Sequence, residues 1–259
     1  MALLDGAPVR AADLTALALT NYGHFTSIRV DDGRVRGLAL HLERLVRDCH
    51  VVFGVDLDPD RVRELAARAA HGRGGSFVLR ITVFDPELDA GDPDRRPRPR
   101  ILITTREAPP AEPPPLRVEC RTFQRMLPTV KHVGLFGALH ELRAARRNGF
   151  DDALFADESA LIHEGATWNA GFVDAAGNVV WPKAEVLPGV TMGLLQEAHD
   201  YTVAPVTTRL ENIRGAFATN AAFGIRPIRA IGDAELDVAL PAFATLREAY
   251  ASHPAEPLG

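Results

Sequence analysis

Leu-Pro-Thr-Val-Lys-His-Val-Gly, at residues 127–134, is the stretch around which we predict both the fold and the chemistry. At its centre is Lys131, and the 29 basic residues of the chain are otherwise arginines except for Lys183. An arginine stays protonated, whereas a lysine ammonium can lose its proton and attack a carbonyl group. Lys131 is therefore a candidate nucleophile, although a lysine that caps a turn is the plainer interpretation of the local sequence alone.

The composition is that of an ordinary globular protein. Of 259 residues, 46% are hydrophobic and 24% are charged, and the net charge of -5 gives no case for binding nucleic acid or an anionic membrane. No apolar run approaches the roughly 20 residues that span a bilayer, and the first residues lack the basic segment of a signal peptide. We therefore expect a cytoplasmic protein whose partners are small molecules or another subunit. The spacing of Cys49 and Cys120 fits neither a disulfide framework nor a metal site.

The first part of the chain alternates strands with helices. Asp58 and Pro59 are typical of a helix start, and Gly54 is typical of a helix end. Proline density then peaks at residues 108–115, where the chain is stiff and extended. We predict a first domain over 1–107, a linker over 108–121 and a second domain over 122–259. In the first part we expect helices over 13–19, 38–53 and 59–71, and strands over 3–9, in the second half of 21–30, over 77–84 and over 100–105.

The second part is dense in short strands, which is typical of a barrel-like domain that carries a few helices. We expect strands over 116–122, 153–156, 160–163, 168–173, 179–181, 203–208, 217–220 and 226–230, and helices over 135–147, from about 191 to 198, and from Pro241 onward.

Four motifs in a fixed order carry a resemblance to a known family. They are His41-Leu-Glu-Arg44-Leu, Lys131, Glu164-Gly-Ala-Thr-Trp-Asn169 and Leu187-Pro-Gly-Val-Thr191. Each is weak alone, but the ordered set resembles the class IV aminotransferases, the fold-type-IV enzymes of pyridoxal 5'-phosphate (PLP). The resemblance implies a mixed fold (α+β or α/β) with a small N-terminal α/β domain and a larger C-terminal pseudo-barrel domain that binds PLP. It also implies a homodimer.

The resemblance assigns roles to residues of these motifs. Lys131 would hold the cofactor aldehyde as a Schiff base and move the proton of the substrate α-carbon. Glu164 would face the pyridine nitrogen, and Arg44 would bind the phosphate. The other cofactor-binding residues that it implies are Asn169, Gly189, Val190, Thr191, Thr219 and Asn220. The histidines show no metal-ligand spacing, so we expect no metal.

The match is looser where the substrate would bind. Arg80 falls where branched-chain enzymes carry a pocket arginine, and a guanidinium there could hold a carboxylate or face solvent. The family's strand ending Thr-Arg-Gly reads Phe84-Asp85-Pro86 here, and Met192 replaces an arginine. The predicted pocket residues are Tyr22, His24, Thr26, Arg80 and Trp168, of which Trp168 replaces a small residue.

Three functions remain open from the sequence. The first is a PLP-dependent aminotransferase that moves an amino group between an amino acid or amine and a 2-keto acid. The second is 4-amino-4-deoxychorismate lyase, which Phe25-Thr26-Ser27, Lys131-His132 and Asn220-Ala221 resemble, with a threonine at 26 or a neighbouring position as the proton donor. The third is a non-catalytic α/β binding protein that keeps only the fold.

Overall fold

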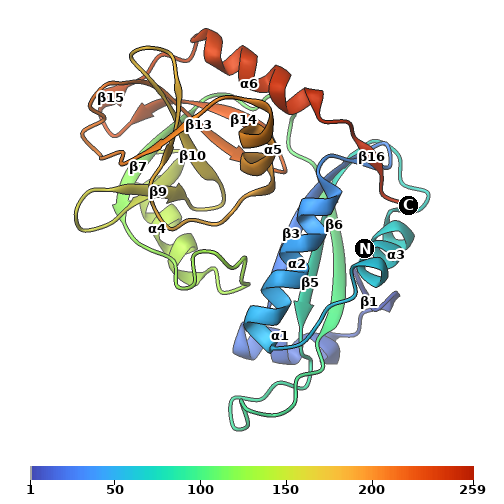
Figure 1. Cartoon of the computed structure of the whole chain (residues 1–259). Coiled ribbons are helices and arrows are strands. Elements are labelled where there is room, and N and C mark those ends of the chain that lie inside the picture. The colour runs from blue at the N-terminus through green and yellow to red at the C-terminus, as the bar shows by residue number, and fades with distance from the viewer. Residues whose placement is uncertain (1) are drawn as a thin grey trace. The chain divides into compact units, whose positions relative to one another are not determined.

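The computed structural model describes residues 2–259, which fold into two compact units. Unit 1 contains the chain up to Ala108 together with Val130–Gly134 and Ala255–Gly259, and unit 2 contains Pro109–Thr129 and Leu135–Pro254. Figure 1 follows the chain through both units by colour. The segment that carries Lys131 folds with unit 1, whereas the predicted boundary places it in the second domain, residues 122–259.

Unit 1 is a seven-stranded antiparallel sheet with helices. The strands pair in the order β16-β4-β3-β5-β6-β1-β2. The strands are β1 Ala2–Leu4, β2 Ala7–Pro8, β3 His24–Asp31, β4 Arg34–Val35, β5 Ser76–Phe84, β6 Arg100–Glu107 and β16 Glu256–Pro257. The helices are η1 Ala11–Leu14, α1 Thr15–Thr20, α2 Leu38–Phe53 and α3 Pro59–Ala70.

The pairing of β3 with β5 fixes which side chains share a face of this sheet. Ile28 and Ile81 lie in the apolar cluster that also contains Leu45 of α2 and Leu65 of α3. Because side chains alternate along a strand, Thr26 projects to the same face as Ile28. Phe25, Ser27, Arg80 and Thr82 project to the opposite face, since Phe25 lies opposite Thr82 and Ser27 lies opposite Arg80.

Helices α2 and α3 begin and end where their sequences predict. Gly37 and Gly54 flank α2 with φ values of 71° and 66°, which favour glycine. The Asp58 carboxylate accepts a hydrogen bond from the Asp60 N–H at 2.9 Å, and Pro59 occupies the first turn of α3. The helix predicted over 38–53 is confirmed, and the one predicted from Pro59 is confirmed to Ala70.

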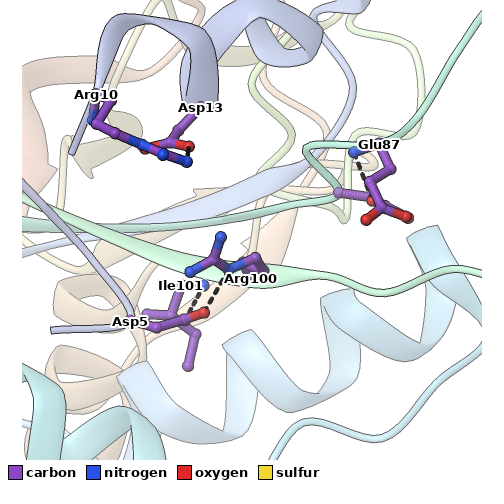
Figure 2. A network of polar contacts seen from close by, with 7 residues as sticks. Asp5, Arg10, Asp13, Glu87, Arg100 and Ile101 are labelled. Carbon is purple, nitrogen blue, oxygen red and sulfur yellow. Dashed lines mark hydrogen bonds and ion pairs between the residues drawn. The ribbon is translucent and has the colours of Figure 1, made fainter. Parts of the chain in front are cut away.

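Polar contacts fix the turn between β1 and β2 against β6. Arg100 Nε donates to Asp5 Oδ2 at 2.6 Å, and the Ile101 N–H donates to Asp5 Oδ1 at 2.9 Å. Figure 2 shows this carboxylate directed at both groups, and nearby Arg10 pairs with Asp13 in η1 at 2.7 Å. One aspartate thereby attaches the turn to the sheet.

Unit 2 is a nine-stranded sheet, six of whose strands close into a barrel. The strands pair in the order β12-β11-β10-β13-β14-β7-β8-β9, β9 also pairs with β10, and β15 pairs with β14. The strands are β7 Leu116–Thr122, β8 Asp152–Ala156, β9 Ile162–Gly165, β10 Asn169–Asp174, β11 Val179–Pro182, β12 Thr202–Ala204, β13 Ile213–Asn220, β14 Gly224–Ile231 and β15 Ala234–Glu235. The helices are α4 Phe136–Arg147, α5 Val190–Ala198 and α6 Pro241–Ser252. The predicted mixed fold with a barrel-like second half is confirmed.

Three apolar clusters hold unit 2 together. One includes Leu154, Phe172 and Ile228 of the barrel strands. A second joins Phe217 of β13 to Leu195 of α5 and to α6, and Figure 1 shows α5 and α6 near β13 and β14. The third joins α4 to β8. Within residues 2–259, no helix combines the length and the apolar character needed to cross a membrane.

The strand predicted over 3–9 is divided by a turn at Asp5 and Gly6 into β1 and β2, and three more predicted segments differ from the structure. The strand predicted over 160–163 begins only at Ile162, because Ala160 has a φ of 64° that closes a turn. The strand predicted over 203–208 ends at Ala204, because Pro205 has no N–H to continue the pairing. The linker predicted over 108–121 is irregular only over 108–115, since the strand predicted over 116–122 is confirmed as β7.

Candidate active site

The backbone around Lys131 is paired with the start of β3. The Phe25 N–H donates to the Lys131 carbonyl at 2.8 Å, and the Val133 N–H donates to the Gly23 carbonyl at 2.9 Å. A Cβ on Gly23 would lie 2.6 Å from the carbonyl oxygen of Val83, so a glycine is needed for this close approach. Lys131 is therefore held at one end of the unit 1 sheet.

Two cationic side chains lie near the Phe25 ring. Lys131 Nζ is 4.9 Å from the ring centroid and Arg80 Cζ is 3.6 Å from it. The two cations are therefore at most about 8.5 Å apart, the sum of these distances. Arg80 Nε donates to Thr82 Oγ1 at 3.2 Å, and burial lowers the pKa of Arg80. Both groups are stabilised by the negative face of one aromatic ring.

Arg44 lies buried in α2, in contact with the strand beside it. Its NH2 group donates to Thr26 Oγ1 at 2.6 Å, and the same oxygen lies 2.7 Å from His41 Nδ1. Burial lowers the pKa of Arg44 to about 10, and Asp48 opposes this effect. Burial, helped by the charges of Arg44 and Lys131, holds the pKa of His41 well below its usual value. A neutral His41 can accept a hydrogen bond from the Thr26 hydroxyl through Nδ1, while the hydroxyl oxygen accepts the hydrogen bond from Arg44.

The two other predicted pocket residues of unit 1 have different surroundings. Tyr22 is 46% exposed, and its hydroxyl donates to the Val52 carbonyl at 2.9 Å. His24 is fully buried, and neither ring nitrogen has a hydrogen-bond partner among the described residues. Burial lowers the pKa of His24 to about 4.

Glu164 lies buried in β9 of unit 2, with both carboxylate oxygens engaged. Arg125 Nε donates to Oε1 at 2.7 Å, and the Leu187 N–H donates to Oε2 at 3.1 Å. Arg125 also donates to the carbonyl of Pro128. One arginine therefore links the Glu164 carboxylate to the loop that leads toward Lys131 in the sequence.

Asn169 connects the predicted residues of unit 2. It lies opposite Glu164 on β9 and opposite Thr219 on β13, so the three side chains share a face. Its Nδ2 donates to the Leu187 carbonyl at 2.8 Å. A Cβ on Gly189 would lie 2.0 Å from Asn169 Oδ1, so only a glycine fits there.

The N-terminus of α5 presents groups suited to an anion. Gly189 is the N-cap and makes no side-chain cap, and Val190 and Thr191 form the first turn. The first N–H groups of a helix have no partner within it, and the helix dipole favours an anion there. The hydroxyls of Thr191 and Thr219 are buried and have no hydrogen-bond partner among the described residues.

Asn220 and Trp168 are the remaining predicted residues. Asn220 ends β13, where its Oδ1 accepts from the Ala222 N–H at 2.9 Å and its Nδ2 donates to the Thr167 carbonyl at 3.3 Å. Trp168 is 4% exposed, lies in the apolar cluster of the barrel and packs on Gly165, where a Cβ would lie 2.0 Å from the indole. The observed role of Trp168 is packing, and its place in a substrate pocket stays a prediction.

The predicted residues divide between the two units. Unit 1 contains Lys131, Arg80, Arg44, Thr26, His24 and Tyr22, with Thr26 and Arg80 on opposite faces of its sheet, and unit 2 contains Glu164, Asn169, Gly189, Val190, Thr191, Thr219, Asn220 and Trp168. No motif in the sequence indicated roles for Arg125, His41 or Asp48. His41, Arg44 and Asp48 are three and four residues apart, which places three polar residues on one buried face of α2 and could have revealed them.

Residues 23–231 match the model of the family described as amino-transferase class IV. No curated protein matches the chain. Among solved structures, the branched-chain aminotransferase of the archaeon Thermoproteus uzoniensis with norvaline is 19% identical, with a TM-score of 0.84 over 100% of this chain and 99% of that chain. The fold IV-transaminase of Curtobacterium pusillum is 23% identical, with a TM-score of 0.78 over 95% and 89%.

A hypothetical aminotransferase of Mycobacterium tuberculosis, in its PLP-bound form, is 17% identical, with a TM-score of 0.83 over 98% of each chain. The solved structures have the same fold as this chain, and the family match covers most of the chain. An enzyme is therefore favoured over a non-catalytic binding protein. The lyase alternative is not favoured. From the match over residues 23–231, the chain belongs to the class IV aminotransferases, which are PLP-dependent enzymes.

Proposed function

We propose that the protein transfers an amino group between an amino acid or amine and a 2-keto acid, with Lys131 as the residue that binds PLP. Bound PLP supplies an aldehyde that condenses with amines and a ring that accepts electrons from the substrate α-carbon. Lys131 would hold this aldehyde through Nζ, and the same amine would accept and return the proton of the substrate α-carbon.

The observation that carries the proposal is the pair of buried hydroxyls at Thr191 and Thr219. A buried hydroxyl without a partner is costly, and a phosphate would accept a hydrogen bond from each. The first N–H groups of α5 add donors that have no partner within the helix. These residues fit the phosphate of PLP, and we assign Arg44 as its cation.

Glu164 fits a position behind the pyridine nitrogen. Each of its oxygens already accepts one hydrogen bond, from Arg125 and from Leu187, but a carboxylate oxygen has two lone pairs. Glu164 can therefore also accept from a protonated ring nitrogen, while Arg125 offsets the cost of burying the anion. Asn169 orients the Leu187 backbone that contacts Glu164.

Arg80 is the residue we assign to the carboxylate of the amino acid or keto acid. Its hydrogen bond to Thr82 uses Nε, and its guanidinium lies within about 8.5 Å of Lys131 Nζ, by the two distances to the Phe25 ring. A guanidinium can bind a carboxylate through two parallel hydrogen bonds. Tyr22 and His24 would line the same pocket.

The proposal is tested by following the half-reaction. The PLP-loaded protein is mixed with single amino acids or amines, and the bound cofactor is released and identified by mass spectrometry. We expect conversion to pyridoxamine phosphate with one equivalent of keto product. Lyase activity would instead release pyruvate and 4-aminobenzoate from 4-amino-4-deoxychorismate. A protein that binds no PLP would contradict both.

In the structure, Thr26 lies between Arg44 and His41, both on α2. A hydroxyl already held by a cation and a neutral histidine is suited to placing Arg44. No specific observation favours Thr26 as the proton donor of a lyase.

We further infer a homodimer in the cytoplasm. Phe136 and Leu139, one turn apart on α4, are 81% and 44% exposed, and Met126 is 81% exposed. Exposed apolar side chains of this size favour a protein interface. Both cysteines are free, which is typical of a reducing compartment. Sedimentation that finds only monomer at micromolar concentration would contradict the dimer, and cell fractionation tests the compartment.

A further inference from the structure

Asp48 is a buried carboxylate that contacts the backbone of Lys131. It lies on α2 and is 0% exposed. Its Oδ2 accepts a hydrogen bond from the Lys131 N–H at 2.9 Å. Its Oδ1 accepts from Arg47 Nε at 3.1 Å and from Arg47 NH2 at 2.7 Å. A carboxylate that accepts from an N–H group makes a stronger hydrogen bond than a neutral acceptor does.

This contact holds the Lys131 segment from a second direction. On one side the Lys131 carbonyl accepts from Phe25 of β3, and on the other the Lys131 N–H donates to α2 through Asp48. The α2 helix is itself fixed by the apolar cluster of unit 1, through residues such as Leu45. The backbone of Lys131 is therefore hydrogen-bonded both to strand β3 and to helix α2, which fixes the position from which its side chain extends.

The groups around Asp48 are cationic or can become so. Arg44 is one turn before it on α2, and Arg47 pairs with it directly. His24 of β3 interacts with its charge, and Lys131 is bonded to it through the backbone. Asp48 therefore supplies negative charge beside the backbone of the residue whose amine we assign to the cofactor.

We propose that Asp48 is a positioning residue for Lys131, which holds its backbone N–H and places a negative charge near its amine. The inference rests on the proposed role of Lys131, but the hydrogen bond can be tested without cofactor. Asp48 acts through Lys131 and need not contact substrate.

The first test uses the fact that the chain has two lysines. Protein labelled with ¹⁵N-lysine gives two backbone amide signals, Lys131 and Lys183, and the Lys183 N–H donates to the Ala204 carbonyl at 2.9 Å. We expect Asp48→Ala to speed hydrogen exchange of the Lys131 amide at least tenfold and to leave Lys183 unchanged. Asp48→Asn, which keeps an oxygen acceptor, should change it less. Unchanged Lys131 exchange in Asp48→Ala would overturn the inference.

The second test uses the PLP-loaded protein. The pH midpoint of the visible absorbance of lysine-bound PLP is measured in the wild type and in Asp48→Asn. Because the variant loses a negative charge near a cation, we expect the midpoint to fall by about half a unit or more. Leu45→Ala, a core variant of the same helix, should destabilise the fold without moving the midpoint. An Asp48→Asn midpoint equal to that of the wild type would overturn the inference, and it decides the matter if Asp48→Ala does not fold.

The two failures are distinguishable. If the wild type never binds PLP at Lys131, the proposed function fails, whatever the amide exchange shows. If the wild type binds PLP at Lys131 but the Asp48 variants match it in amide exchange and in pH midpoint, the function stands and the role of Asp48 fails.

Discussion

In unit 2, Arg125 Nε donates a hydrogen bond to Glu164 Oε1 at 2.7 Å, and the two side chains are 9% and 8% exposed. Removing one partner of a buried pair leaves a charge without compensation, at a cost of about 3–5 kcal/mol. We expect Arg125→Met to lower the free energy of unfolding by about that amount in urea titrations. The double variant Arg125→Met, Glu164→Gln should recover part of it.

The matched control is the exposed pair of Arg61 and Glu64, joined at 2.8 Å. Arg61→Met should cost less than about 1 kcal/mol, because solvent screens this pair. Equal costs for Arg125→Met and Arg61→Met would show that the Glu164 carboxylate does not depend on Arg125.

Removing the hydroxyl of Thr191 or Thr219 should have opposite effects on two quantities. It should not lower the stability of the cofactor-free protein, but it should weaken the binding of PLP. Because neither hydroxyl has a partner in the described residues, Thr191→Val should not destabilise the cofactor-free protein and should stabilise it by up to about 1 kcal/mol. The same variant should weaken PLP binding about tenfold or more, since it loses a hydrogen bond to an anion. Equilibrium dialysis measures the affinity for PLP and for pyridoxal, which lacks the phosphate. The difference between the two affinities gives the contribution of the phosphate to binding.

Affinity for pyridoxal should stay unchanged in Thr191→Val and Thr219→Val. Thr245→Val, at an exposed position on α6, serves as the control and should bind PLP as the wild type does. Equal losses for PLP and pyridoxal would refute the assignment of these hydroxyls to the phosphate.

Gly189 is packed too closely against Asn169 to accept a side chain. In Gly189→Ala the new Cβ would displace Asn169 Oδ1 and strain the hydrogen bond from Asn169 to Leu187. We expect a loss of about 1–3 kcal/mol in unfolding free energy. Gly74→Ala is the control, because an ideal Cβ there has open space. If both glycine variants unfold at the same urea concentration, the close approach is not present in solution.

The buried His24 should make the free energy of unfolding depend on pH. Burial lowers its pKa from 6.5 to about 4, so between these values the unfolded chain binds a proton that the folded chain does not. Stability therefore rises with pH through this window and falls as pH drops from 6.5 toward 4, by about 3 kcal/mol from this residue. His41, whose pKa is also lowered, acts in the same direction.

We expect His24→Asn to flatten the pH dependence of the unfolding free energy over this window, whatever its effect at pH 7. His71→Asn, which changes an exposed histidine, should keep the slope of the wild type. A His24→Asn slope as steep as that of the wild type would mean that His24 is not buried as a neutral ring.

Local patterns in the sequence predicted much of the fold. The α2 helix is bounded by glycines and has a regular apolar face, so its residue range followed from local rules. The start of β9 did not, because the left-handed conformation of Ala160 depends on the turn around it. The placement of the Lys131 segment with unit 1 depends on pairing with β3, more than 100 residues earlier, which no local pattern reveals.

For the candidate site, motifs identified single residues but not their connections. Glu164, Asn169 and Gly189 were predicted one by one, whereas the backbone of Leu187 that joins Glu164 to Asn169 emerges only from the folded chain. Arg125 and Asp48 carried no motif, and their roles depend on contacts with Glu164 and Lys131, 39 and 83 residues away.

The central claim is that Lys131 binds PLP covalently. Borohydride reduces the carbon–nitrogen double bond between a lysine and the cofactor aldehyde to a stable single bond, and peptide mass spectrometry then locates the label. We predict that the label lies on Lys131 alone, is lost in Lys131→Ala and is kept in Lys183→Arg. A label on Lys183, or none on a protein shown to be folded and incubated with PLP, would contradict the account.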